Sequence, residues 1–165
     1  MVSPLSGAAF VLMMSAPAPV NPDDVVIALA GYPRTAVAAQ PAQERAMLGA
    51  LNAARRRVGL GPLVRDQRLD RVARDHALDM VSRQYFGHDT PDGVDPFERM
   101  RAAGVPFGYA GENLAMNADA ATAERAFMHS AEHRANILEP HYRRVGIATA
   151  GDAGDGEFFV QEFTD

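Results

Sequence analysis

The chain has 165 residues, of which 47% are hydrophobic and 22% charged, values that fit a single globular domain and exclude a chain disordered throughout. Sixteen basic and 21 acidic side chains give a net charge of −5, so the chain lacks the positive excess that a nucleic-acid groove needs. Cysteine is absent, which excludes disulfides, a thiolate nucleophile and cysteine-ligated zinc.

The first 42 residues are predicted to lie outside the folded domain. Residues 1–20 carry no charge and contain an apolar run, residues 7–14, followed by small residues, a pattern typical of a secretory signal. The competing interpretation is a disordered N-terminus. The run is too short to cross a bilayer, which needs about 20 apolar residues, so we expect no transmembrane segment. Residues 21–42 contain three prolines, which disfavour a long helix, and are interpreted as a linker or arm.

The domain proper is predicted to cover residues 43–165 and to begin with helices. Residues 43–58 form the first helix, because apolar side chains recur at helical spacing. The second helix follows Asp66, a capping residue, and we expect it to bury one stripe of side chains: Leu69, Val72, Ala73 and Met80.

Two further helices have clear start signals. Asp95 is followed by proline at the first helical position and by Glu98 three residues later, which is typical of a capped helix start. Gly104 ends that short helix. Asp119 caps another helix, which runs to about His129.

The C-terminal part of the domain predicts strands. Residues 145–150 and 157–163 are rich in β-forming residues and flank the glycine- and aspartate-rich turn 151–156, so we expect a β-hairpin. Helices come first and strands late, without alternating strand–helix–strand units. This order favours an α+β fold with an antiparallel sheet covered by helices.

The five histidines differ in what their surroundings predict. His76 lies on the apolar face of the second helix and is interpreted as a core histidine bonded to a neighbour. His141 is interpreted as an exposed loop residue, and His129 is given no specific role. His88 follows Phe86-Gly87 in a loop beside Asp89, where the preceding helix can hold it in place.

Three polar side chains complete the candidate set. Glu112 follows a glycine-rich turn. It is a candidate because glycine lets the backbone bend sharply there and direct the carboxylate toward the interior. His133 follows Ser130 by three residues, so the two side chains can share one face of a short helix. Ser130 is a weak candidate nucleophile, and we favour the interpretation that it caps that helix.

Several segments together resemble the bacterial branch of the CAP superfamily, which comprises the cysteine-rich secretory, antigen 5 and pathogenesis-related 1 proteins. The resemblance spans residues 43–164 and rests on these stretches: NAAR at 52–55, GLGPL at 59–63, FGH at 86–88, PFERM at 96–100, GENLA at 111–115, SAEHRANIL at 130–138, VGI at 145–147 and FVQEF at 159–163.

The resemblance implies an exported three-layer α-β-α sandwich with a central antiparallel sheet and a cleft lined by two histidines and acidic residues. By position, His88 and His133 are similar to the cavity histidines and Glu112 to the cavity glutamate, and some family members bind a divalent cation there. Ser130 stands where eukaryotic members carry a second glutamate, and Glu124 and Glu132 are out of register. We therefore expect weak cation binding, with zinc preferred to calcium.

The candidate residues are compatible with three functions. We favour an exported, non-enzymatic module located outside the cell or in the cell envelope, which binds a small molecule, a lipid or a cell-envelope component. The alternative is a hydrolase, either metal-assisted through His88, Glu112 and His133 or serine-type through Ser130. No Gly-x-Ser-x-Gly elbow accompanies Ser130, which counts against the serine type. The third possibility is a structural domain whose polar cleft is a relic.

Overall fold

The computed structural model describes residues 41–152 and 156–165, so the predicted signal segment and most of the predicted arm lie outside the described residues. The elements in chain order are α1 (Pro41–Arg57), β1 (Val64–Arg65), α2 (Gln67–Arg83), α3 (Pro96–Ala102), β2 (Ala110–Asn117), α4 (Ala120–His129), α5 (Ala131–Ile137), β3 (Arg144–Asp152) and β4 (Gly156–Thr164). The first helix thus begins at Pro41, two residues before the expected start of the domain.

The predicted helix starts are confirmed. The Asp66 side chain accepts a hydrogen bond from the Arg68 backbone N–H at the start of α2. Asp95 and Glu98 form a reciprocal capping box at α3, with proline in the first turn. Asp119 accepts from the Thr122 backbone N–H and caps α4. These side chains satisfy N–H groups that have no partner within the helix.

A four-stranded sheet, in the order β1-β3-β4-β2, forms the centre of the molecule. The predicted hairpin is present as β3 and β4, and β2 pairs antiparallel with the other side of β4. The expectation of a purely antiparallel sheet is wrong, because β1 pairs parallel with β3. No hairpin joins these two strands; the chain crosses most of the domain between them and re-enters the sheet in the same direction.

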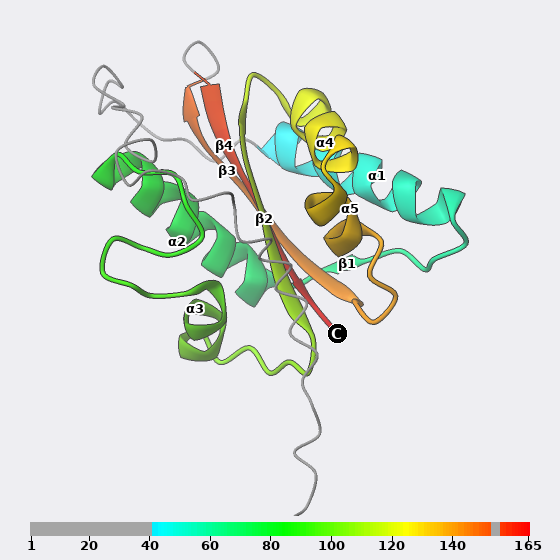
Figure 1. Ribbon diagram of the computed structural model, residues 1–165, viewed down its shortest axis with the longest axis horizontal. Coiled ribbons are helices and arrows are strands. Elements are labelled where there is room, and N and C mark those ends of the chain that lie inside the picture. The colour runs from blue at the N-terminus through cyan, green and yellow to red at the C-terminus, as the bar shows by residue number, and fades with distance from the viewer. Residues whose placement is uncertain (1–40, 153–155) are drawn as a thin grey trace, which may run out of the picture.

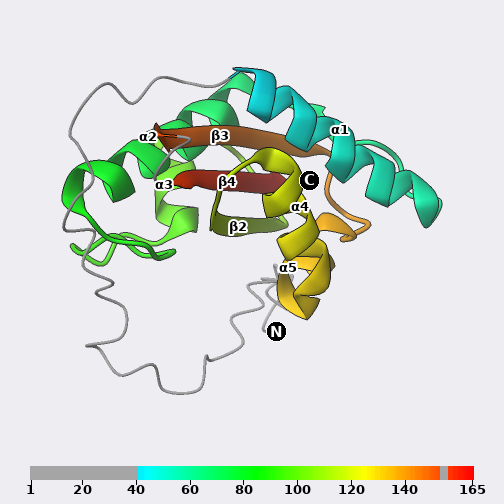
Figure 2. The same cartoon turned by 90° about the horizontal axis from the view of Figure 1, so that it is seen from above.

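Helices cover both faces of the sheet, so the fold is an α-β-α sandwich (Figures 1 and 2). One face packs against α2 and α3, and the predicted stripe of α2 is buried there. The other face packs against α1, α4 and α5 around a cluster of aromatic and aliphatic side chains that includes Phe127, Ile147, Phe159 and Phe163.

Strand alternation sends neighbouring polar residues of β2 to opposite faces. Glu112 lies directly opposite Glu162 of β4, on the side of α2 and α3. Asn113 lies opposite Gln161, on the side of α4 and α5. Two separate polar clusters therefore lie back to back across one edge of the sheet.

The backbone of α2 approaches β3 very closely at Gly146. A Cβ atom built on Gly146 would lie 2.2 Å from the backbone carbon and 2.3 Å from the carbonyl oxygen of Leu69. Only a residue without a side chain allows this contact, which sets the height of α2 over the sheet.

Candidate functional site

An imidazole–carboxylate pair forms the centre of the candidate site. The loop after α2 carries His88 and β2 carries Glu112, and the Nδ1 atom of His88 lies 2.6 Å from the Oε1 atom of Glu112. The Glu112 side chain is fully buried, whereas 37% of the His88 side chain is exposed. The pair therefore joins the interior to the surface, and the bond to Nδ1 leaves Nε2 of His88 for other partners.

Arg99 of α3 holds both members of this pair. Its Nη2 atom donates to the Oε2 atom of Glu112 at 2.6 Å, and its Nη1 atom donates to the backbone carbonyl of His88 at 2.8 Å. The same nitrogen reaches the carbonyl of Val94, which ties down the other end of the loop. Arg99 belongs to the PFERM stretch, but nothing in the sequence distinguished it from the other arginines.

A second carboxyl group, that of Glu162, lies beside Glu112 in the interior. Its side chain is fully buried, and its Oε1 atom lies 3.9 Å from the Nη2 atom of Arg99. Burial and the negative charge of Glu112 raise the pKa of Glu162 well above its usual range. The surroundings of Glu162 therefore favour its protonated form, whereas those of Glu112 favour the carboxylate.

The charges around Glu112 set its protonation. Burial alone opposes ionisation, but the hydrogen bond with His88 and the positive charge of Arg99 outweigh it and lower the pKa of Glu112 to about 2. Burial likewise opposes protonation of His88, yet its hydrogen bond to Glu112 raises the pKa of His88. The arrangement stabilises a carboxylate next to an imidazole that is easily protonated.

His76 confirms its interpretation as a core histidine. It is 1% exposed, and its Nε2 atom lies 3.0 Å from the carbonyl of Gly87, which fixes the start of the loop that carries His88. Burial lowers the pKa of His76, which favours the neutral ring. Because a carbonyl oxygen only accepts, the Nε2–H group of His76 donates this bond. His141 is confirmed as an exposed loop residue, with 52% of its side chain exposed.

Ser130 has the structural role that we favoured. It is the N-cap of α5, and its Oγ atom accepts a hydrogen bond from the backbone N–H of His133. A nucleophilic serine needs a hydrogen bond to a general base, whereas the Ser130 oxygen is hydrogen-bonded to a backbone N–H group. The geometry is therefore evidence against Ser130 as a nucleophile.

His133 lies on α5, apart from the bonded pair. Its ring packs edge-on against Phe127, with 5.1 Å between the ring centres. Burial and the positive charge of His88 lower the pKa of His133, so the two imidazole rings interact electrostatically. The structure thus bonds His88 directly to Glu112 and leaves His133 as a neighbour.

The described side chains do not assemble a three-ligand metal site. Within residues 41–152 and 156–165, no three His, Asp or Glu side chains are arranged to hold one ion. Both oxygens of Glu112 are already engaged, one by His88 and one by Arg99. This donor set does not fit a closed zinc site, and zinc binding by His88, Glu112 and His133 stays a prediction.

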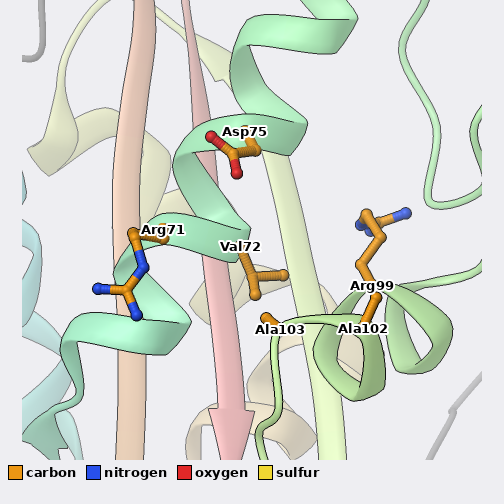
Figure 3. Close-up of a pocket in the computed structure, with 6 residues that line it drawn as sticks. All are labelled: Arg71, Val72, Asp75, Arg99, Ala102 and Ala103. Carbon is orange, nitrogen blue, oxygen red and sulfur yellow. The ribbon is translucent and has the colours of Figure 1, made fainter.

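A groove borders the site between α2 and α3. It has a volume of about 440 Å³ and is lined by Arg71, Val72, Asp75, Arg99, Ala102 and Ala103 (Figure 3). Arg99 therefore connects the buried carboxylate of Glu112 with a hollow on the surface. Among the described helices, none is long and apolar enough to cross a membrane.

Comparisons with known proteins agree on one family. The CAP family profile, described as the cysteine-rich secretory protein family, matches residues 48–163. The protein YkwD of Bacillus subtilis is 35% identical over 125 residues, which cover 74% of this chain and 47% of YkwD. This chain therefore spans less than half the length of that relative.

Two solved structures have the same architecture. An extracellular protein of Bacillus anthracis that contains an SCP domain is 28% identical with a TM-score of 0.69, covering 88% of this chain and 44% of that protein. An outer surface protein of Borrelia burgdorferi superposes with a TM-score of 0.72 at 17% identity, covering 79% of this chain and 98% of that protein.

Proposed function

Because the chain belongs to the cysteine-rich secretory protein (CAP) family, we propose that it is a ligand-binding module that works outside the cell or at the cell envelope. We propose that its ligand is held at the site formed by His88 and Glu112. The observation that carries this proposal is a partly exposed imidazole whose inner nitrogen is bonded to a buried, ionised carboxylate. The extracellular and surface location of similar proteins supports the location.

The site has the chemistry of a binding site for a polar group. With Nδ1 bonded to Glu112, the Nε2 atom of His88 accepts a hydrogen bond when the ring is neutral and donates one when the ring is protonated. A hydroxyl, amide or phosphate group on a small molecule, a lipid or a cell-envelope polymer would satisfy it. Arg99 keeps the pair rigid, which reduces the entropy that binding must overcome.

The alternative function is a hydrolase that uses His88 as a base. A carboxylate-bonded imidazole is the arrangement that activates a water or a hydroxyl in many hydrolases, and this geometry favours the alternative. Against it stand the capping role of Ser130 and the complete burial of the Glu162 carboxyl group, which a substrate cannot reach. We therefore rank binding above catalysis.

The experiment that tests binding follows the imidazole carbon signal of His88 by NMR. Probes are zinc ions, solubilised cell-wall fragments, and vesicles of phosphatidylglycerol. At least one probe should shift the His88 signal while the exposed His141 signal stays in place, and His88→Ala should abolish binding of that probe. If His88 and His141 respond alike to every probe, the site is not a binding site.

Zinc binding is also measured by calorimetric titration of the wild type, His88→Ala and His133→Ala. We expect weak binding that both substitutions reduce and that acidification abolishes, because a histidine must be unprotonated to bind a metal ion. Equal heats for the three proteins would remove zinc from the proposal and leave the metal-free binding site.

A further inference from the structure

A chain of buried polar side chains crosses the sheet face beneath α4 and α5. The Nε2 atom of Gln161 donates to the Oε2 atom of Glu124 at 3.0 Å. The Nδ2 atom of Asn113 donates to the Oε1 atom of Gln161 at 3.0 Å, and the Nδ2 atom of Asn136 donates to the Oδ1 atom of Asn113 at 3.0 Å. All four residues are buried, so the side chains satisfy one another rather than solvent.

This chain ends on the backbone of two candidate site residues. The second N–H of Asn113 donates to the carbonyl of His133 at 3.1 Å. The second N–H of Asn136 donates to the carbonyl of Glu112 at 3.1 Å. A carboxylate on α4 is thereby connected to the backbone of His133 through two side-chain amides and to the backbone of Glu112 through three.

The direction of every bond follows from the carboxylate at the start of the chain. An ionised Glu124 can only accept, so Gln161 must turn its NH₂ group toward it and its oxygen toward Asn113. Asn113 must then present its NH₂ group, which leaves its own oxygen for Asn136. With any other orientation of Gln161, two like groups would meet in a buried place.

We propose that Glu124 is a positioning residue for the site. Through Gln161 and Asn113 it fixes the hydrogen bond to the carbonyl group of His133, and through the further link to Asn136 it fixes the hydrogen bond to the carbonyl group of Glu112. The importance of this for ligand binding rests on the proposed function of the site. The bonds themselves belong to the fold, so the two claims can fail separately.

The surroundings of Glu124 make its charge sensitive to pH. It lines a groove of about 280 Å³ between α1 and α4, where Arg57, Arg125 and His129 are the other ionisable groups. Its Oε1 atom has no hydrogen-bond partner among the residues that the structure describes. Burial raises the pKa of Glu124 to about 7, against the opposing effect of the Gln161 bond, so its charge changes close to neutral pH.

The test measures NMR signals of the Asn113 side-chain NH₂ group and of the His133 ring at pH 8. Glu124→Gln keeps a carbonyl acceptor of the same shape and is the matched control, which should leave both signals in place. Glu124→Leu removes the acceptor and should shift both. Gln161→Leu should shift them as well, and Glu124→Leu should add nothing in the Gln161→Leu background.

A loss of packing alone would not depend on Gln161. Equal effects of Glu124→Leu with and without Gln161, or unchanged His133 signals, would therefore overturn the proposal. A titration avoids the destabilised variants: the Asn113 NH₂ signals of the wild type should shift with a midpoint near pH 7, and Glu124→Gln should abolish that shift. A shift that survives in Glu124→Gln would also contradict the proposal, whereas the response of His88 to its probes tests the site itself.

Discussion

The buried carboxylate of Glu112 depends on two neighbours for its charge. Its side chain is fully inaccessible, and the Arg99 guanidinium and the His88 imidazole are both 2.6 Å away. An unpaired charge in such a place costs several kcal/mol, so the stability of the fold and the geometry of the site rest on the same contacts.

Arg99→Ala tests the larger of these contacts. The substitution leaves a buried carboxylate without its guanidinium, and we expect the free energy of unfolding at pH 7 to fall by about 3–5 kcal/mol. Urea unfolding measures the change. Arg71→Ala, an exposed arginine that lines the same groove, is the matched control and should change the free energy by less than about 0.5 kcal/mol. Equal losses in the two variants would show that Arg99 does not stabilise the buried charge of Glu112.

Glu112 should also make the protein sensitive to acid. Its pKa is lowered to about 2 in the folded state, against an ordinary value of 4.5. The stabilisation is therefore complete above about pH 4.5 and is lost as the pH falls toward 2, with a total of about 3 kcal/mol. Urea unfolding from pH 6 to pH 2 should give a flatter profile for Glu112→Gln than for the wild type.

Glu162→Gln is the matched control across the strand pair. The raised pKa of Glu162 means that the unfolded chain ionises first, so the wild type loses stability as the pH rises above about 4.5. Glu162→Gln should remove that loss and keep the acid slope that Glu112 causes. A Glu112→Gln profile as steep as the wild type would contradict the assigned charge of Glu112.

The sequence indicated some residues of the site and missed others for a physical reason. His88 and Glu112 stand in recognisable local motifs, and the structure bonds them to each other. That His133 shares one cavity with them stays a prediction. Arg99 is one of 16 basic residues, and only the path of the loop after α2 brings it to Glu112. Glu162 lies in a run of β-forming residues, and its position depends on the register between β2 and β4, which no local pattern encodes.

At the scale of elements, the sequence predicted those helix starts and turns that depend on side chains close together in the chain. Caps set the starts of α2, α3 and α4, and a turn sequence set the β3–β4 hairpin. The strand β2 was not predicted, because six consecutive residues are buried and show no alternation of polar and apolar side chains. The short strand β1 is defined only by its pairing with β3.

Gly146→Ala tests the close contact between α2 and β3. The new methyl group would lie within 2.2 Å of the Leu69 backbone, which is not a flexible side chain, so α2 must move away from the sheet. We expect a loss of about 1–3 kcal/mol or more in the free energy of unfolding.

The matched control is Gly49→Ala in α1, where a new Cβ atom meets nothing within 4 Å. This substitution should stabilise the protein by about 0.5–1 kcal/mol, because alanine favours the helix. Thermal unfolding of both variants measures the contrast. A Gly146→Ala protein as stable as the wild type would show that α2 has room to shift without cost.

At the scale of the whole molecule, the apolar N-terminal segment and the proposed location lead to a prediction about export. We expect export with removal of the N-terminal segment. Mass spectrometry of the culture supernatant should find a mature chain that begins between about Ala18 and Asp24. A cytosolic marker protein controls for cell lysis. Full-length protein found only in the cytosol would contradict both the signal prediction and the proposed location.

The strand order has a consequence for folding. The strand β4 lies between β3 and β2, yet it is the last described element to be synthesised. Before it emerges, β2 has no sheet partner, and the apolar faces of α2 and α4 have only part of a sheet to cover. The β2–β4 pairs also join residues about 40–54 positions apart, a separation that slows folding. The sheet of the described domain can therefore be completed only after its last strand has been made.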